Sequence, residues 1–404
     1  MGLETPVVQL IISQLSNAEV NLAAFGFSFS LMLLFESPIF LILSSAVSLI
    51  NGKEVYIKFR NFTLIIGTLL SFLMLLTVYL LHSAGGFIST KNPNLNLLIY
   101  LTSLILTPVP FFVAFRRFYQ GLLIRFAKPH FVTLATLCRL LTTIVLSLVL
   151  FNLAPFEGAV TGAIAVVIGT ITESVVVRLL ARSSVVNLKE TKEKKSYLEL
   201  AKFYLPLAFS SLISVAVMYI LNFLMAFAKD SQFSIAGFSI LTSLNFLFAS
   251  LGLAFQDVTL AKLSENTSWF LYLKKALFFL ISAVTALYII CFIFPPLSVF
   301  IFSNLYKLSV KKVFILQTAA VFTLLRLFVS YLTIWQRALL IHSKRSHYFG
   351  KATFLEFTVS SLLMLILTFL SNFKGIYLAA FSWALGRTAA YFYLKRKVKD
   401  IIYN

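Results

Sequence analysis

Residues Leu122–Thr136 read LLIRFAKPHFVTLAT, and residues Leu339–Thr353 read LLIHSKRSHYFGKAT. The Leu-Leu-Ile and Ala-Thr pieces of the first stretch recur in the second at an offset of 217 residues. Two pairs of glycines keep the same offset: Gly158 with Gly375, and Gly169 with Gly386. Because a constant offset over several helices is typical of an internal repeat, the sequence predicts two similar halves.

Both halves are strongly apolar. Hydrophobic residues make up 60% of the 404 residues and charged residues 12%, and the mean hydropathy is +0.94. Apolar runs of about 20 residues, the length that crosses a bilayer as a helix, recur along the whole chain. This composition excludes an ordinary soluble domain and predicts an all-α polytopic membrane protein.

Apolar length and breaks predict about 12 transmembrane helices in two pseudo-symmetric six-helix bundles. The predicted helices are Pro6–Leu15, Phe25–Ile50, Phe62–Leu81, Leu95–Ile124, Phe131–Leu150, Gly158–Leu180, Ala201–Phe227, Phe233–Leu260, Trp269–Pro295, Val313–Ile341, Phe349–Leu370 and Ile376–Leu394. Residues 1–182 form the N-terminal bundle, residues 183–199 a cytoplasmic linker, and residues 200–404 the C-terminal bundle. The first helix spans only about 15 Å of a core about 30 Å thick, so it is truncated or is a half-span inside the bundle.

The basic residues predict the orientation. The chain has a net charge of +20. Its Lys and Arg residues gather after the second, fourth, sixth, eighth and tenth predicted helices and in the tail Lys395–Lys399. Positive loops stay on the cytoplasmic side, so both termini are predicted to be cytoplasmic, in the plasma (inner) membrane. The same charges are too dispersed to indicate a nucleic-acid partner.

Repeated halves of six helices indicate a transporter. Because six is even, the halves are related by an axis along the membrane normal, and such halves enclose a cavity near the midplane. Rocking of the halves then exposes the cavity to each side in turn, which is alternating access. The alternative is a duplicated membrane scaffold without transport.

Glu36-Ser37-Pro38 interrupts the second predicted helix. A buried carboxylate in a membrane needs a partner or a cavity. Pro38 removes a backbone donor and kinks or unwinds the helix just before it, and Ser37 can satisfy a freed carbonyl. We predict a coupling-ion or proton site at Glu36; a purely structural pair with an arginine is the alternative.

Other ionic residues lie inside predicted helices. Arg116 and Arg117 lie near the cytoplasmic end of the fourth helix, and Arg326 lies near the middle of the tenth. Arginine favours bidentate capture of phosphate or carboxylate, so these residues predict an anion site, with snorkelling to headgroups as the alternative for Arg125 and Arg337.

Arg139 and Glu356 are related by the offset of 217, and we expect them to pair between the halves as a gate or a structural lock. Glu173 and Arg387 lie on the closing helices of the two halves. Each of them is expected to face the cavity or to pair with another helix.

The sequence gives little sign of an enzyme. It has no P-loop, GxSxG or HExxH motif, and no histidine pair has metal-ligand spacing. Cys138 and Cys291 lie inside apolar runs, where buried packing is expected rather than a disulfide or a metal site. No cofactor and no metal are predicted.

The whole pattern resembles the MATE-type (multidrug/oligosaccharidyl-lipid/polysaccharide) exporter superfamily. The stretches NAEVNLAAFGFSFSLMLLFESP (Asn17–Pro38) and RRFYQGLLIR (Arg116–Arg125) are most similar to its progressive ankylosis-type branch. The resemblance implies a V-shaped pair of bundles and ion-coupled or facilitated export. Multidrug members often bind the coupling ion through an acidic residue of the first helix, where this chain has only Glu4.

These observations together predict a secondary active or facilitative exporter of a small organic or phosphorylated anion. Two alternatives are a flippase for a lipid-linked oligosaccharide or polar lipid and a multidrug cation antiporter. The implied partners are a small-molecule or lipid-linked substrate, H⁺ or Na⁺ as coupling ion, and the lipid bilayer.

Overall fold

The computed structural model describes residues 4–402 except residues 16, 51, 85–92, 154–155, 187, 189–195, 266, 344 and 346–347. Helices account for nearly all of the described part, and an isolated bridge joins Lys229 and Lys374. The predicted all-α class is therefore confirmed. The charged core of the predicted linker lies among the residues outside this description.

The first half of the chain follows the predicted order of helices. Its elements are α1 (Glu4–Ile12), α2 (Ala18–Glu36), the 3-10 helix η1 (Ser37–Leu41), α3 (Ile42–Leu49), α4 (Lys53–Ser83), α5 (Pro93–Leu106), α6 (Val109–Arg125), α7 (Pro129–Leu153), α8 (Gly158–Leu180) and α9 (Arg182–Val186). The fourth predicted helix is wrong as one continuous helix, because it breaks between Leu106 and Val109. Proline lacks a backbone donor and suits a first helical turn, so α6 starts at Val109 with Pro108 as its N-cap residue and Pro110 in its first turn.

The second half contains one region that the prediction missed. Its elements are α10 (Tyr197–Met225), α11 (Ser231–Glu265), the 3-10 helix η2 (Thr267–Trp269), α12 (Phe270–Phe292), α13 (Pro295–Val299), the π-helix η3 (Phe300–Leu305), α14 (Val310–His342), α15 (Tyr348–Leu370) and α16 (Gly375–Ile402). The pair Pro295-Pro296 starts α13 as a new helix for the same reason as at α6. The helices α13 and η3 lie between the predicted transmembrane helices Trp269–Pro295 and Val313–Ile341.

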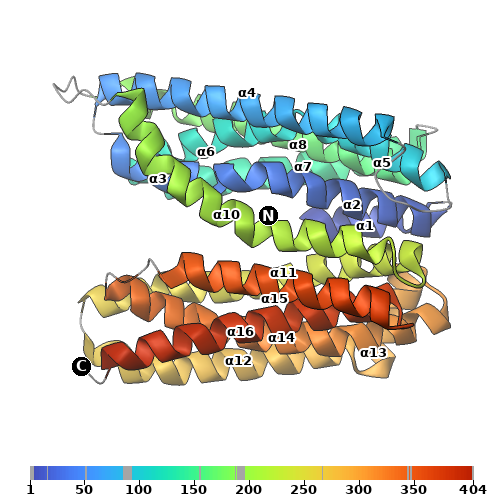
Figure 1. The fold of residues 1–404 in the computed structure, drawn as a ribbon. Coiled ribbons are helices and arrows are strands. Elements are labelled where there is room, and N and C mark those ends of the chain that lie inside the picture. The colour runs from blue at the N-terminus through green and yellow to red at the C-terminus, as the bar shows by residue number, and fades with distance from the viewer. Residues whose placement is uncertain are drawn as a thin grey trace. The chain divides into compact units, whose positions relative to one another are not determined.

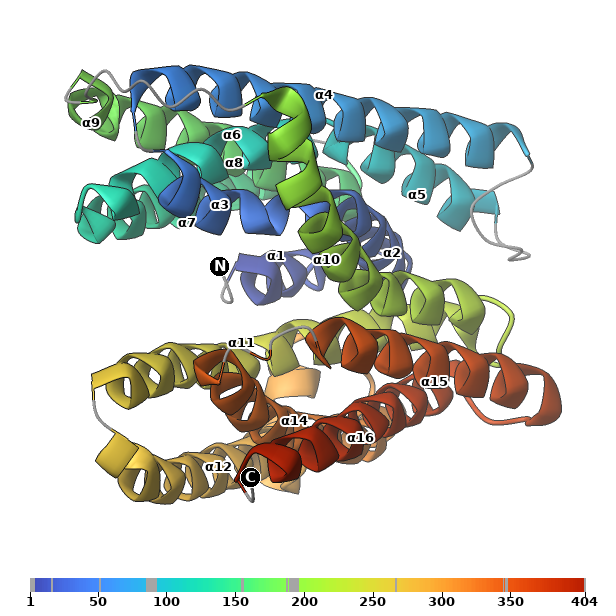
Figure 2. The same cartoon turned by 60° about the vertical axis from the view of Figure 1, so that its left-hand side comes forward.

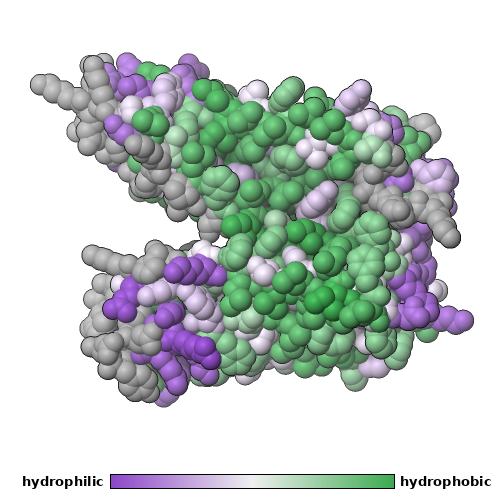
Figure 3. Space-filling model, viewed as in Figure 1, coloured by the Kyte–Doolittle hydropathy of each residue, from purple (hydrophilic) through white to green (hydrophobic). Residues whose placement is uncertain are grey.

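The helices have the lengths and surfaces of membrane spans. Nine helices or helix runs in the described residues are long and apolar enough to cross a bilayer. Figure 3 shows apolar side chains over the sides of the helices and hydrophilic side chains toward their ends. Large apolar side chains on the outer faces, such as Phe279 and Leu370, are about four-fifths exposed at 78% and 81%. The chain is a multi-pass membrane protein.

The helices pack into two compact units, Val7–Tyr219 and Ile220–Asn404 (Figure 1). The change from one unit to the other falls within α10. The division at residues 183–199, made from the repeat, stays a prediction.

Close packing repeats with the repeat of the sequence. A Cβ atom added to Gly169 in α8 would lie 3.3 Å from the carbonyl oxygen of Arg139 in α7. A Cβ atom added to Gly386 in α16 would lie 2.7 Å from the carbonyl oxygen of Glu356 in α15. Both helix pairs therefore approach at a glycine, as small residues allow in membrane bundles. The side-chain hydroxyl groups nearest to the two glycines keep the offset of 217 residues too: that of Thr143 lies beside Gly169, and that of Ser360 beside Gly386.

Candidate functional site: two buried ion clusters

The predicted break at Glu36-Ser37-Pro38 is confirmed. The α-helix α2 ends at Glu36, the next turn is 3-10, and α-helical geometry returns at Ile42. Pro38 has no backbone donor, and the Ser37 hydroxyl donates to the carbonyl oxygen of Leu34 at 2.7 Å. The phenol of Tyr204 in α10 donates to the carbonyl oxygen of Pro38. The break thus places the buried carboxyl of Glu36 at the end of a helix.

Glu36 belongs to a group that we call the N-terminal ion cluster: Glu36, Arg116, Arg139 and Glu173. The carboxyl of Glu173 in α8 is completely buried, with 0% of its side chain exposed. Arg116 of α6 donates to Oε2 of Glu173 through Nη1, and Arg139 of α7 donates to the same oxygen at 3.2 Å. Arg116 Nη2 also lies 3.8 Å from Oε1 of Glu36, so one guanidinium joins both carboxylates.

Two polar residues that sequence reasoning missed complete this cluster. Gln120 Nε2 and Thr136 Oγ1 donate to Oε1 of Glu173 at 3.0 and 2.9 Å. Gln120 lies one turn after Arg116, and Thr136 lies three residues before Arg139, so each shares a helix face with its arginine. This helical spacing from an arginine is the sequence signal that could have identified both residues. Glu173 accepts four hydrogen bonds, and the cluster's two carboxylates balance its two guanidiniums.

Arg117 lies beside this cluster rather than in its hydrogen-bonded centre. Its side chain is half-buried, and its guanidinium carbon lies 6.0 Å from the centre of the Phe40 ring in η1. Arg117 also interacts electrostatically with Glu36 and Glu173, so it adds a further cation beside the cluster.

The second unit holds the C-terminal ion cluster, which we define as Arg326, Arg337, Glu356 and Arg387. Arg387 Nη1 of α16 lies 3.1 Å from Oε2 of Glu356 in α15. Arg326 Nη2 of α14 lies 3.6 Å from Oε1 of the same carboxyl. The helices α14, α15 and α16 lie side by side in both ribbon views (Figure 2).

Aromatic rings hold two of these arginines. The guanidinium carbon of Arg326 lies 3.5 Å from the ring centre of Trp383, and that of Arg337 lies 5.7 Å from the ring centre of Phe349. Arg337 also interacts electrostatically with Arg387 and Glu356. Trp383 is a further residue that sequence reasoning missed, although it precedes Arg387 by one helical turn.

The C-terminal ion cluster has more cations than anions. The Nε atoms of Arg326, Arg337 and Arg387 are buried and have no hydrogen-bond acceptor among the described residues. Two guanidiniums pair with the single carboxylate of Glu356, and the third, that of Arg337, interacts with it electrostatically. Because a buried cation without a counterion is costly in a low-dielectric medium, this cluster is suited to attract an anion.

The expected pairing of Arg139 with Glu356 stays a prediction, and each of the two residues has partners within its own unit. Arg139 pairs with Glu173, and Glu356 pairs with Arg326 and Arg387, each within its own unit. Glu173 and Arg387 both pair with neighbouring helices, which was one of the two expectations. In each unit the next helix along the chain supplies the opposite charge: α8 carries Glu173, and α16 carries Arg387.

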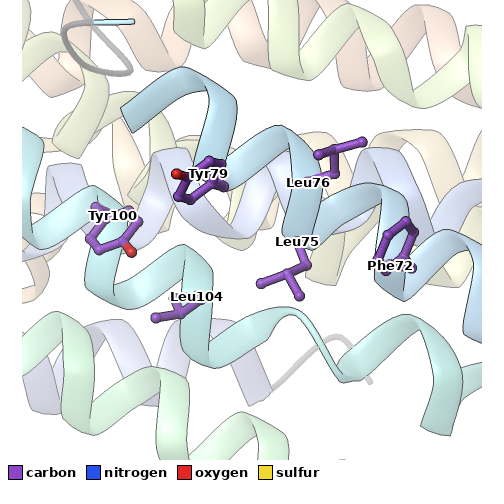
Figure 4. Close-up of a pocket in the computed structure, with 6 residues that line it drawn as sticks. All are labelled: Phe72, Leu75, Leu76, Tyr79, Tyr100 and Leu104. Atoms are coloured by element: carbon purple, nitrogen blue, oxygen red, sulfur yellow. The ribbon is translucent and has the colours of Figure 1, made fainter. Parts of the chain in front are cut away.

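The cysteines and the lipid-facing grooves lie apart from the clusters. Cys138 and Cys291 are half-buried free thiols, where full burial was expected. A groove between α4 and α5 has a volume of about 340 Å³ and an apolar lining that includes Leu75, Tyr79 and Leu104 (Figure 4). A similar groove is lined by Leu141 and Ile168. Within the described residues, no group of three His, Cys, Asp or Glu side chains is arranged to hold a metal ion.

No protein-family profile matches this chain. No curated protein sequence matches it either.

Solved structures with a similar fold do exist. An inward-facing multidrug resistance MATE family transporter of the MOP superfamily is 19% identical, with a TM-score of 0.78 over 100% of this chain and 95% of that one. The lipid II flippase MurJ in an inward closed conformation is 16% identical, with a TM-score of 0.73 over 98% and 85%. A MOP superfamily transporter from Pyrococcus furiosus, described by the reversed polarity of its binding pocket, is 16% identical, with a TM-score of 0.63 over 98% and 95%.

These likenesses confirm the MATE-like fold that the sequence resembles. They extend over the whole chain, so the two-bundle architecture is that of MATE and MurJ structures. Nearness to the progressive ankylosis-type branch stays a prediction.

Proposed function

We propose that the chain is a secondary active or facilitative exporter of a small organic or phosphorylated anion, which works by alternating access and leaves its substrate chemically unchanged. The observation that carries the substrate class is the excess of guanidinium over carboxylate in the C-terminal ion cluster. The fold shared with transporters and a flippase supports the exporter part.

We assign the predicted site residues to two roles. Arg326 and Arg387 take part in anion binding, with Glu356 as the carboxylate that pairs with them when no anion is bound, and with Arg117 as a further cation near the helix break. Glu36, Ser37 and Pro38 form the site for H⁺ or Na⁺, because a carboxylate at the end of a broken helix is a suitable cation ligand. Arg116, Arg139 and Glu173 connect Glu36 to the rest of the first unit through hydrogen bonds. We place the protein in the plasma (inner) membrane with both termini in the cytoplasm.

A flux assay tests this function. The purified protein in liposomes is expected to move labelled pyrophosphate or citrate faster than protein-free liposomes do. A pH or Na⁺ gradient is expected to change that rate if the transport is coupled. A lipophilic cation that moves while none of the anions does would overturn the anion assignment and favour the multidrug antiporter.

A lipid flippase is the second candidate, and the likeness to the lipid II flippase MurJ favours it. The same guanidiniums are suited to the phosphate of a lipid-linked sugar. The two candidates differ in the assay: flippase activity moves a labelled lipid between leaflets without release of a soluble anion. The third candidate, a multidrug cation antiporter, rests on the multidrug MATE likeness.

A further inference from the structure

We infer that the C-terminal ion cluster is the binding site for a polyvalent oxyanion and that Glu356 is a tethered carboxylate that competes with this ligand. The inference rests on the proposed function and gives its anion a location and a displaceable partner. It assigns a different role to the N-terminal ion cluster, where four donors hold Glu173 in place.

The first argument is the contrast between the two buried carboxylates. Glu173 accepts four hydrogen bonds, from Arg116, Arg139, Gln120 and Thr136. Glu356 has two ion pairs, at 3.1 and 3.6 Å, and accepts no side-chain hydrogen bond in the part of the chain that the structure describes. A carboxylate with four donors is fixed in place, whereas one held by two ion pairs alone is easier to displace.

The second argument is the number of donors that remain. Three guanidiniums supply many N–H groups, and a single carboxylate has two oxygens to accept them. The Nε atoms of Arg326, Arg337 and Arg387 have no acceptor among the described residues. A phosphate or polycarboxylate brings more oxygens and more negative charge than Glu356, so it satisfies more of these donors.

The third argument is the way in which the arginines are held. Trp383 lies against the face of the Arg326 guanidinium, and Phe349 lies near that of Arg337. Stacking uses the flat face of a guanidinium, whereas its N–H donors point outward in the plane. The aromatic contacts therefore fix two of the cations while their donors remain directed at a ligand. Arg387, 14% exposed, and Arg326, 11% exposed, are not sealed from the surroundings.

Binding of labelled pyrophosphate and citrate to the full-length protein in neutral-lipid nanodiscs tests the site. We expect Arg387→Gln and Arg337→Gln to weaken binding about tenfold or more, because each removes a buried donor fork. Glu356→Gln removes the competing carboxylate and keeps its shape, so it is expected to tighten binding several-fold. Arg337→Lys keeps the charge and loses the fork, so we expect a loss smaller than that of Arg337→Gln.

The matched control is Lys311→Gln, which removes one positive charge from an exposed position on the same helix, α14. It is expected to bind as the wild type does. Size-exclusion profiles and melting curves show which variants are folded. Short-chain phosphatidic acid as a competitor distinguishes the source of the oxyanion: displacement of pyrophosphate supports the same site with a lipid phosphate as its ligand.

Two results would overturn the inference. Weaker binding in folded Glu356→Gln would make Glu356 a ligand-supporting residue rather than a competitor. Unchanged binding in folded Arg387→Gln and Arg337→Gln, while liposomes still transport the anion, would place the anion elsewhere and leave the proposed function intact. Wild-type protein that neither binds nor transports any of the anions would remove both proposals.

Discussion

At the scale of single residues, Glu173 is the centre of the N-terminal ion cluster. Four donors from α6 and α7 converge on one completely buried carboxyl. In a low-dielectric interior, removal of one charged member from such a network is costly, because it leaves its partners buried without a counterion. Its function as a clamp between three helices follows from that geometry.

Glu173→Gln is therefore expected to lower the free energy of unfolding by about 3–5 kcal/mol, because it leaves two buried guanidiniums with less negative charge. Glu36→Gln is expected to cost less, since Glu36 meets Arg116 only at 3.8 Å. Melting of the two purified variants in the same detergent measures the difference. Equal losses would show that the hydrogen-bond count does not determine stability here.

Glu36 has a different expected effect, which is on transport. Glu36→Gln removes the carboxylate at the helix break and is expected to slow anion flux in liposomes several-fold. Glu19→Gln is the control, because it makes the same change at the first turn of the same helix, α2. Unchanged flux in folded Glu36→Gln protein would exclude Glu36 from the coupling mechanism.

At the scale of elements, close helix packing depends on two glycines that occupy equivalent positions. Gly386 lets α16 approach the backbone of α15 at Glu356, which is the residue that carries the carboxylate of the C-terminal ion cluster. A side chain at Gly386 would therefore separate the helices that bring Glu356 and Arg387 together.

Gly386→Ala is expected to destabilise the protein by about 1–3 kcal/mol, because its Cβ would lie 2.7 Å from the Glu356 carbonyl oxygen. Gly350→Ala is a matched control in α15, where an added Cβ meets nothing within 4 Å. We expect that control to be neutral or slightly stabilising, since alanine favours helix. Thermal unfolding of both variants measures this, and a control as unstable as Gly386→Ala would contradict the packing argument.

The elements also show what sequence reasoning can reach. The sixth helix has its predicted bounds, Gly158–Leu180, because glycine and charged residues flank a long apolar run. The break before α6 was missed, since its prolines lie inside a run whose apolar character is continuous. The ninth helix was predicted to end at Pro295, but the short helices α13 and η3 that follow were missed. Length and composition define such runs, but they do not show where a proline begins a new helix.

Partners within the clusters were harder to predict than their members. The ionic residues were identified because each is costly in an apolar helix. Which of them pair depends on the rotation of each helix and on its neighbour, and a single sequence contains neither. That is why Gln120, Thr136 and Trp383 were not identified as partners of the ionic residues.

At the scale of the whole molecule, the duplicated halves carry their charges in transposed order. The first half has arginines on α6 and α7 and acids on α8 and at the end of α2, whereas the second has arginines on α14 and α16 and its acid on α15. Arg139 and Glu356 are the equivalent residues with opposite sign. The repeat thus keeps the helix packing at the two glycines, while the ionic residues at equivalent positions differ.

The orientation of the whole chain is the last prediction. Lys and Arg gather in the loops after even-numbered predicted helices and in the tail, which predicts that both termini are cytoplasmic. Green fluorescent protein fused after Asn404 is therefore expected to fluoresce in a bacterial host, because it folds on the cytoplasmic side. Alkaline phosphatase joined after Ala84, beyond α4, is expected to be active because it is exported. An active phosphatase fused after Asn404, together with an inactive one after Ala84, would show the opposite topology.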